Sequence, residues 1–180
     1  MGLNAVALLW GFAEATLFFI VPDVWLSAIA VGRSHRAALR ATGWAIGGAV
    51  LGGALMHAWG RVDPAGVIAV CDRLPAISPA MIAGVRDDLA RQGAVAVVIG
   101  GVTGVPYKIY AVLAPEAGLS LLPFLLISIP ARAIRFVLAV LIADGINRLL
   151  ARWLPLRQRY AVLGVVWLAF YVFYFAVMPN

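Results

Sequence analysis

Five charged residues lie inside apolar stretches of this 180-residue sequence, namely Glu14, Asp23, Lys108, Arg132 and Arg135. A charged side chain at the centre of a bilayer costs about 2.5–3.5 kcal/mol on insertion scales, so such side chains usually face a cavity or an opposite charge. The two acidic residues are therefore candidate proton-coupling carboxylates. The three basic residues are candidate ligands of an anion.

Two of the basic residues have a spacing that brings them together. Arg132 and Arg135 are three positions apart, so a helix presents both on one face. Such a pair requires an anionic partner, which is Glu14, Asp23 or the phosphate of a lipid or substrate. A guanidinium suits phosphate because it binds two oxygens at once. The structural alternative places both arginines at the membrane interface, where they bind headgroups non-specifically.

The other three residues have structural alternatives as well. Lys108 follows Pro106 in a glycine-rich apolar segment, where it is either a phosphate ligand or a side chain that reaches the interface. Glu14 either faces a cavity or reaches outward in the same way. Asp23 follows Pro22, where it either lines a cavity or caps a helix.

The composition indicates the class of protein to which these residues belong. Hydrophobic residues make up 64% of the chain and charged residues 12%, and the mean hydropathy is +0.98. Soluble domains have about 25% charged residues, so a soluble domain, a disordered chain and a coiled coil are excluded. A single cysteine, Cys71, excludes a disulfide framework. The net charge of +6 comes from arginines beside apolar segments, which indicates membrane topology rather than nucleic-acid binding.

The distribution of charge predicts the topology. Basic segments 32–40 and 144–159 are expected in the cytoplasm and the neutral segment 60–92 outside. The glycine-rich stretch 41–59 then crosses once. For 144 to lie inside, 93–114 must enter and return, which agrees with its break at Pro106. The first apolar stretch, 3–31, is broken at Pro22 and is expected to form a second hairpin, with one tilted span as the alternative.

These segments predict an all-α integral membrane domain with an inverted repeat. Each repeat is a re-entrant hairpin plus a transmembrane helix, and many transporters share this plan. Repeat one is 3–59, the polar linker 60–92, repeat two 93–143, the basic loop 144–159 and the C-terminal transmembrane helix 160–178. Within the linker, Ser78 and Pro79 are typical of a helix start, which predicts a short surface helix over 79–92.

Other residues are expected to be structural. Gly43-xxx-Gly47 and Gly48-xxx-Gly52 permit close approach of another helix, either within the chain or in a homo-oligomer. We expect His57 at the membrane interface, Glu116 in a loop, and the aromatic residues of 167–175 against lipid or in an interfacial belt. No enzyme, phosphate-loop or dinucleotide motif is found, so neither catalysis nor a cofactor nor a metal site is expected.

Two stretches resemble a known family. They are EATLFFIVPD, which ends at Asp23, and GVPYKIYAVLAPEAGLSLLPFLLISIPARAIRFVLA, which begins at Gly104. Together they resemble the DedA/VTT (SNARE-associated Golgi protein) superfamily, near its small YqaA-like members, over most of residues 10–142. The resemblance implies opposed re-entrant hairpins and lipid translocation coupled to ion gradients. Thr103 departs from the pattern, because many members have Arg at this position before the hairpin proline.

The resemblance and the charge inventory predict a transporter of the bacterial inner membrane that crosses it several times. Its substrate is expected to be a phospholipid or a polyprenyl phosphate, moved by a flippase or scramblase mechanism. Glu14 and Asp23 would couple protons, while Lys108, Arg132 and Arg135 would hold the headgroup. One alternative is a proton-coupled transporter of a small soluble solute. The other is a non-transporting scaffold or assembly factor, in which the buried charges form a static network.

Overall fold

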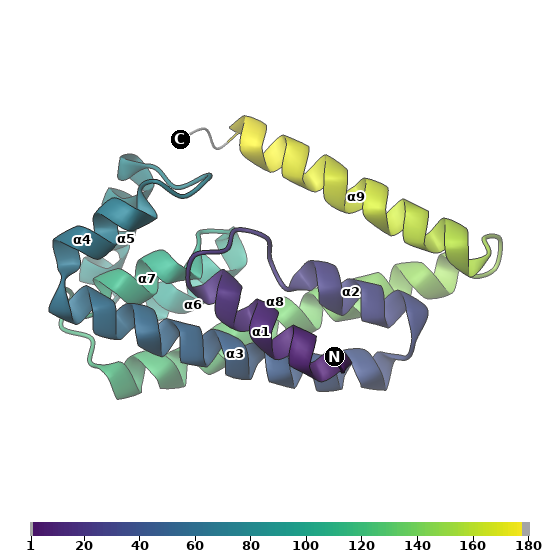
Figure 1. Ribbon diagram of the computed structural model, residues 1–180, viewed down its shortest axis with the longest axis horizontal. Helices are drawn as coiled ribbons and strands as arrows, with labels where there is room; N and C mark the ends of the chain where they lie inside the picture. Colours follow the sequence, from purple (N-terminus) through teal and green to yellow (C-terminus); the bar gives the residue numbers. More distant parts are fainter. Residues whose placement is uncertain (1, 178–180) are drawn as a thin grey trace.

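The computed structural model describes residues 2–177, which form helices and connecting loops without a strand (Figure 1). The chain is all-helical in this range, as the sequence predicts. The helices are α1 Leu3–Ala15, α2 Asp23–Gly32, α3 His35–Val62, α4 Pro64–Cys71, α5 Pro79–Gln92, α6 Val95–Thr103, α7 Tyr107–Leu113, α8 Leu121–Leu150 and α9 Leu156–Val177.

Two long helices, α3 and α8, form the frame of the molecule. They run in opposite directions, because His57 near the end of α3 lies beside Leu119, just before the start of α8. The Ser34 side chain begins α3 by accepting a hydrogen bond from the amide of Ala37. Such a cap satisfies one of the free N–H groups at a helix start.

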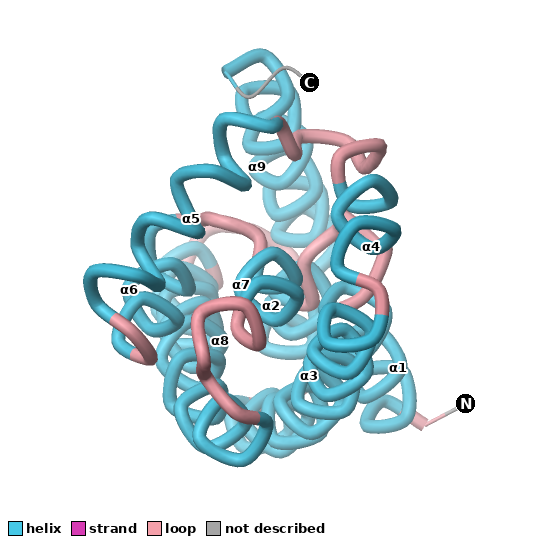
Figure 2. The backbone as a smooth tube through the Cα atoms, turned by 90° about the vertical axis from the view of Figure 1, so that its left-hand side faces the viewer, coloured by secondary structure: helices cyan, strands magenta, loops and turns pink. Residues whose placement is uncertain are grey.

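The short helices pack across this frame in a crossed pattern. Helix α1 packs on α3 and α6 packs on α8, whereas their successors change partner, with α2 on α8 and α7 on α3. Figure 2 shows α2 and α7 near the centre, flanked by α6 and α8 on one side and by α1 and α3 on the other. Each pair of short helices therefore contacts both long helices.

Glycines on α3 make the close packing possible. A Cβ on Gly48 would overlap the backbone of Leu8 in α1, and a Cβ on Gly53 would overlap the ring of Tyr107 in α7. Gly43 and Gly47, by contrast, lie on an open face, where a Cβ would meet no atom within 4 Å. The glycine pattern thus serves packing within the chain on one side of α3, and leaves small residues exposed on the other.

Both pairs of short helices are interrupted at a proline. Pro22 stands immediately before α2 and Pro106 immediately before α7, as N-cap residues. A proline at this position costs the helix no hydrogen bond, since the first amides of a helix have no intrahelical acceptor. In the second break, Gly104 has φ of +90°, a left-handed conformation that ends α6. The breaks expected at Pro22 and Pro106 are therefore present.

The polar and basic segments differ in detail from expectation. The surface helix is confirmed as α5, Pro79–Gln92, with the Ser78 hydroxyl accepting a hydrogen bond from the amide of Met81. The segment 144–159 is not one basic loop, because α8 continues to Leu150 and α9 begins at Leu156. Basic residues do not interrupt a helix, since arginine has a high helix propensity. For the same reason α3 already begins at His35, within the basic segment 32–40.

Two helices, α8 and α9, are long and apolar enough to cross a membrane. Helix α3 has 28 residues but is not among the helices that are apolar enough by this measure. Helix α9 begins earlier than the expected 160–178, has no buried residue and packs mainly on α2. Residue 178, the last of the expected helix, lies outside the described residues.

Candidate functional site

Two ion pairs connect the first broken segment to α8. Arg132 Nη2 lies 2.8 Å from Glu14 Oε2, with both side chains at most 5% exposed. Arg135 Nε lies 3.1 Å from Asp23 Oδ2, with the arginine 21% exposed. The two arginines therefore share a face of α8, and their partners are the two carboxylates that the sequence singles out.

Lys108 joins the same cluster without a carboxylate of its own. Its Nζ donates a hydrogen bond of 2.7 Å to the carbonyl oxygen of Phe18, in the first break. Among residues 2–177, no carboxylate lies within ion-pair distance of Lys108, whose side chain is buried. Three basic side chains thus face two carboxylates, which leaves one buried positive charge unmatched.

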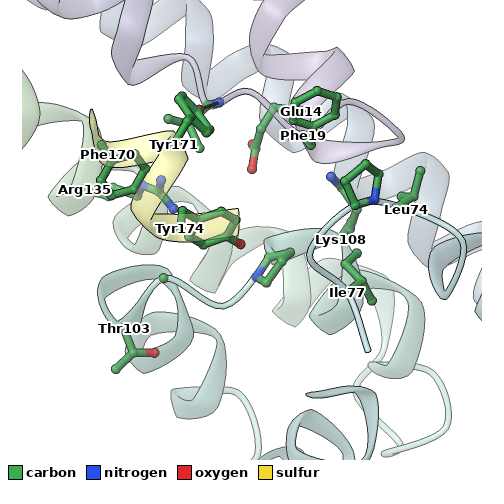
Figure 3. A pocket seen from close by; sticks show the side chains of 14 residues that line it. Glu14, Phe19, Leu74, Ile77, Thr103, Lys108, Arg135, Phe170, Tyr171 and Tyr174 are labelled. Carbon is green, nitrogen blue, oxygen red and sulfur yellow. Dashed lines mark hydrogen bonds between the residues drawn. The ribbon is translucent and has the colours of Figure 1, made fainter. Parts of the chain in front are cut away.

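The cluster borders a cavity of about 190 Å³ under α9 (Figure 3). Glu14, Lys108 and Arg135 provide its charged wall. Aromatic side chains of α9 cover it from one side, and the loop between α4 and α5 covers it from another. The cavity also includes Phe19, Thr103, Pro106, Leu74, Ile77, Phe170, Tyr171 and Tyr174. Arg132 and Asp23 do not line this cavity. Each instead pairs with a residue that does, Arg132 with Glu14 and Asp23 with Arg135.

Arg132 is fixed by neighbours that sequence reasoning did not single out. Its guanidinium carbon lies 4.1 Å from the ring centroid of Tyr107, a cation–π contact. The Tyr107 hydroxyl donates a hydrogen bond of 2.8 Å to Ser128 Oγ on α8. Arg132 Nε and Nη1 and Asp23 Oδ1 are buried without a hydrogen-bond partner among the described residues. The ion pairs therefore leave buried donors on Arg132 and a buried acceptor on Asp23 unused. Such atoms can form hydrogen bonds with a new partner.

Helix α9 is attached to the first broken segment by polar contacts rather than by burial. The amide of Val21 donates a hydrogen bond of 2.9 Å to the Tyr171 hydroxyl, and Trp167 Nε1 donates one of 3.0 Å to Ser27 Oγ. Tyr171 and Trp167, which are expected against lipid or in an interfacial belt, thus also hydrogen-bond residues of the first broken segment. Hydropathy does not distinguish a lipid-facing aromatic residue from one that faces a cavity.

Two further residues lie outside the cluster. His57, expected at the interface, is buried with its ring centroid 5.4 Å from that of Phe124, and it donates a hydrogen bond of 2.9 Å from Nε2 to the carbonyl oxygen of Leu119. Glu116 lies in the turn after α7 and pairs with Arg86 of α5 at 2.7 Å, on the exposed surface. The hydrogen bond with Glu116 raises the pKa of Arg86. Both residues connect helices.

Within residues 2–177, no group of three or more His, Cys, Asp or Glu side chains is arranged to hold a metal ion. The cluster instead offers ammonium and guanidinium donors to an oxyanion, beside carboxylates able to accept protons. A scan against models of known protein families, a search of curated proteins and a search of solved structures each found no match.

Proposed function

We propose that this protein is a membrane transporter that translocates a lipid with an anionic headgroup, either a phospholipid or a polyprenyl phosphate. One observation carries the proposal: in a buried cluster of three cations and two carboxylates, Glu14, Lys108 and Arg135 line a cavity. A net positive charge buried at membrane depth is costly unless an anion visits it. A phosphate entering the cavity would supply that anion and meet two donors, Lys108 and Arg135.

The surface of the protein supports a location in a membrane, which we propose is the bacterial inner membrane. Large apolar side chains are exposed along α8 and α9, for example Leu122 at 68% and Phe173 at 66%. Soluble monomers rarely expose contiguous apolar surface of this kind. The basic residues at the start of α3 and around the turn between α8 and α9 would then face the cytoplasm. With α3, α8 and α9 as spans, the chain crosses the membrane several times.

The crossed packing supports an inverted repeat of re-entrant hairpins. Helices α1, α2 and α3 correspond in order and packing to α6, α7 and α8, and each short pair breaks at a proline. The frame helices run in opposite directions, as two units of opposite orientation require. Broken helices are tolerated at membrane depth where they line a cavity, which both breaks do here. The resemblance to the DedA/VTT superfamily adds the same expectation.

Proton coupling would follow from competition for the arginines. A phosphate that approaches Arg135 competes with Asp23 for the guanidinium, and the carboxylate that is released in this way becomes a proton acceptor. A headgroup bound at Lys108 would also bring negative charge beside Glu14 in the same cavity, which favours the protonated carboxyl. Protons would thus bind the carboxylates while the headgroup occupies the cations.

Lys108 offers the sharpest test, because removing it breaks neither ion pair. We would reconstitute the protein in vesicles containing a trace of headgroup-labelled phosphatidylglycerol and measure how fast an external quencher reaches the inner-leaflet label. The wild type and Lys108→Arg are expected to expose it quickly. Lys108→Gln is expected to be slow while its Cys71 thiol stays protected, which reports an intact fold. Arg86→Gln, which removes a surface charge, is the matched control.

The outcomes separate the proposal from its rivals. No exchange by the wild type, with or without a pH gradient, would overturn lipid translocation in favour of a soluble solute or a scaffold. The scaffold has one observation in its favour, since both carboxylates already have partners. In a scaffold, Lys108→Gln would leave every transport signal unchanged. Uptake of a soluble anion that depends on Lys108 would favour the solute transporter.

A further inference from the structure

A second cavity lies beside the charged one and opens on the apolar surface. It measures about 500 Å³ and runs between α6, α8 and α9. Leu138, Ile142 and Val166 line it and are 47%, 60% and 57% exposed, so the groove faces the surroundings of the protein. Apart from Asp23, Thr103 and Arg135 at its inner end, the lining is apolar.

The two cavities meet at shared residues. Thr103, Gly104, Arg135 and Phe170 line both of them. Figure 3 shows Arg135 and Phe170 together on one side of the charged cavity, opposite Lys108. Gly104, in a left-handed conformation, ends α6 at this junction without a side chain. The charged cavity and the apolar groove are therefore adjacent, with Arg135 on the wall of both and Lys108 on the far wall of the charged one.

We propose that the groove between α6, α8 and α9 is a binding site for one hydrocarbon chain of a lipid whose anionic headgroup lies at Lys108 and Arg135. This inference rests on the proposed function and deepens it, because it adds the half of the substrate that the charged cluster does not recognise. Arg135 marks the junction between headgroup and chain. The chain extends past Leu138 and Ile142 and leaves the protein sideways into the bilayer.

Charge complementarity selects this occupant over a second copy of the chain. A helix from another protomer laid in the groove would cover apolar surface but bring no anion to the unmatched positive charge. A lipid fills both cavities with one molecule, since it carries an anion and an apolar chain. A free phosphate would satisfy the cluster and leave the groove unfilled. The adjacency of the cavities at Arg135 therefore favours a molecule that is both charged and apolar.

The test uses a chain-labelled lipid in vesicles. Phosphatidylglycerol with a photoreactive diazirine on one acyl chain is reconstituted with the full-length protein, irradiated, and the adducts are located by mass spectrometry. Adducts are expected to concentrate on residues of the groove, including Leu138, Ile142 and Val166, rather than on the equally exposed Leu126. A diacylglycerol with the same diazirine, which lacks the phosphate, is expected to label the groove about tenfold less.

A substitution that fills the groove provides the second arm. Ala139 lines it, so Ala139→Phe is expected to reduce both adduct formation and headgroup exchange about tenfold, since the bulky ring competes with the chain. Ala58→Phe makes the same change on an exposed position of α3 and is expected to leave both unchanged. Protection of the Cys71 thiol in both variants confirms that each is folded.

Each result decides one inference. Suppose that the wild type exchanges lipid. If the adducts then spread evenly over α8, or if Ala139→Phe exchanges lipid at the normal rate, the chain-binding role of the groove is overturned and lipid translocation stands. Equal labelling by the uncharged lipid overturns the connection to Arg135. No exchange by any protein overturns translocation, and adduct formation then decides the groove by itself. Dissociation of an oligomer by Ala139→Phe without lipid adducts would assign the groove to a second copy.

Discussion

Arg132 Nη2 lies 2.8 Å from Glu14 Oε2 across 118 positions of sequence, and both side chains are almost entirely buried. The contact joins the end of α1 to the middle of α8. It sits beside Tyr107, whose ring covers the guanidinium from α7. Three helices that are distant in sequence therefore meet at one ion pair.

Breaking this pair is expected to destabilise the protein strongly. Glu14→Gln leaves Arg132 buried without a countercharge, and the loss of one partner of a buried pair typically costs about 3–5 kcal/mol. Arg86→Gln, which breaks the exposed pair with Glu116, is expected to cost about 1 kcal/mol or less. Unfolding of both variants in a graded series of denaturing detergent compares them. Equal losses would contradict the buried character of the Glu14 pair.

Two neighbouring glycines on α3 are expected to respond in opposite ways. Gly48→Ala places a methyl group against the backbone of Leu8 and is expected to destabilise by about 1–3 kcal/mol. Gly47→Ala meets nothing within 4 Å, so it is expected to be neutral or stabilising, because alanine favours the helix by about 0.8–1.0 kcal/mol. The same unfolding series measures both. Destabilisation by Gly47→Ala would instead indicate that this face packs on another protomer.

Tyr171 is expected to protect the first break from solvent exchange. Tyr171→Phe removes the hydroxyl that accepts the Val21 amide, so that amide should exchange its hydrogen faster. Losing a net hydrogen bond of about 1 kcal/mol corresponds to roughly fivefold faster exchange. Hydrogen exchange of peptides covering 16–22 measures this. Tyr174→Phe, whose hydroxyl has no hydrogen-bond partner among residues 2–177, should leave the rate unchanged.

The Cys71 thiol is expected to be alkylated slowly, and its alkylation rate is expected to rise at a higher pH than that of a free thiol. The thiol is 2% exposed and burial raises its pKa above the usual value, so less thiolate forms at a given pH than in a free cysteine. Alkylation should remain slow at neutral pH and accelerate at a higher pH than for a model thiol. Denaturation should abolish the difference. Reaction of the native protein at the model-thiol rate would contradict the burial of Cys71.

The two ends of α3 are expected on opposite sides of the membrane. Asn4 lines a surface pocket with Ala37 and Arg40 at the basic end, whereas Asp63 follows the last residue of α3. In a Cys71→Ser background, Asn4→Cys should label only from the cytoplasm and Asp63→Cys only from outside. Gln92→Cys, at the end of α5, should behave like Asp63→Cys. Labelling of residue 4 from outside would contradict a hairpin at Pro22.

The chemistry of the cluster was predictable from residue types and spacing, because a charge in an apolar stretch is conspicuous. The spacing of Arg132 and Arg135 predicts a shared helix face, and the structure gives them such a face. Which arginine takes which carboxylate depends on the register of α1 and α2 against α8. That register is a product of packing between distant segments, and no local pattern carries it.

Other features escaped prediction because local signals are the same in two environments. Tyr107 stacks on Arg132 and Tyr171 holds the first break, yet each reads as an ordinary membrane aromatic residue. His57 reads as interfacial, but it hydrogen-bonds a carbonyl oxygen that α8 brings beside it. The helix over 79–92 was predictable to the residue because Ser78 and Pro79 determine its start locally.

The position of both arginines on α8 has a consequence for how the protein is made. The carboxylates leave the ribosome 118 and 112 residues before their partners. At 5–20 residues per second, this delay lasts roughly 6–24 s. During that time Glu14 and Asp23 lack the countercharges that α8 supplies, so burial of the first broken segment is costly. The first broken segment therefore gains its buried ion pairs only once α8 has been made, and the segment synthesised first becomes stable among the last.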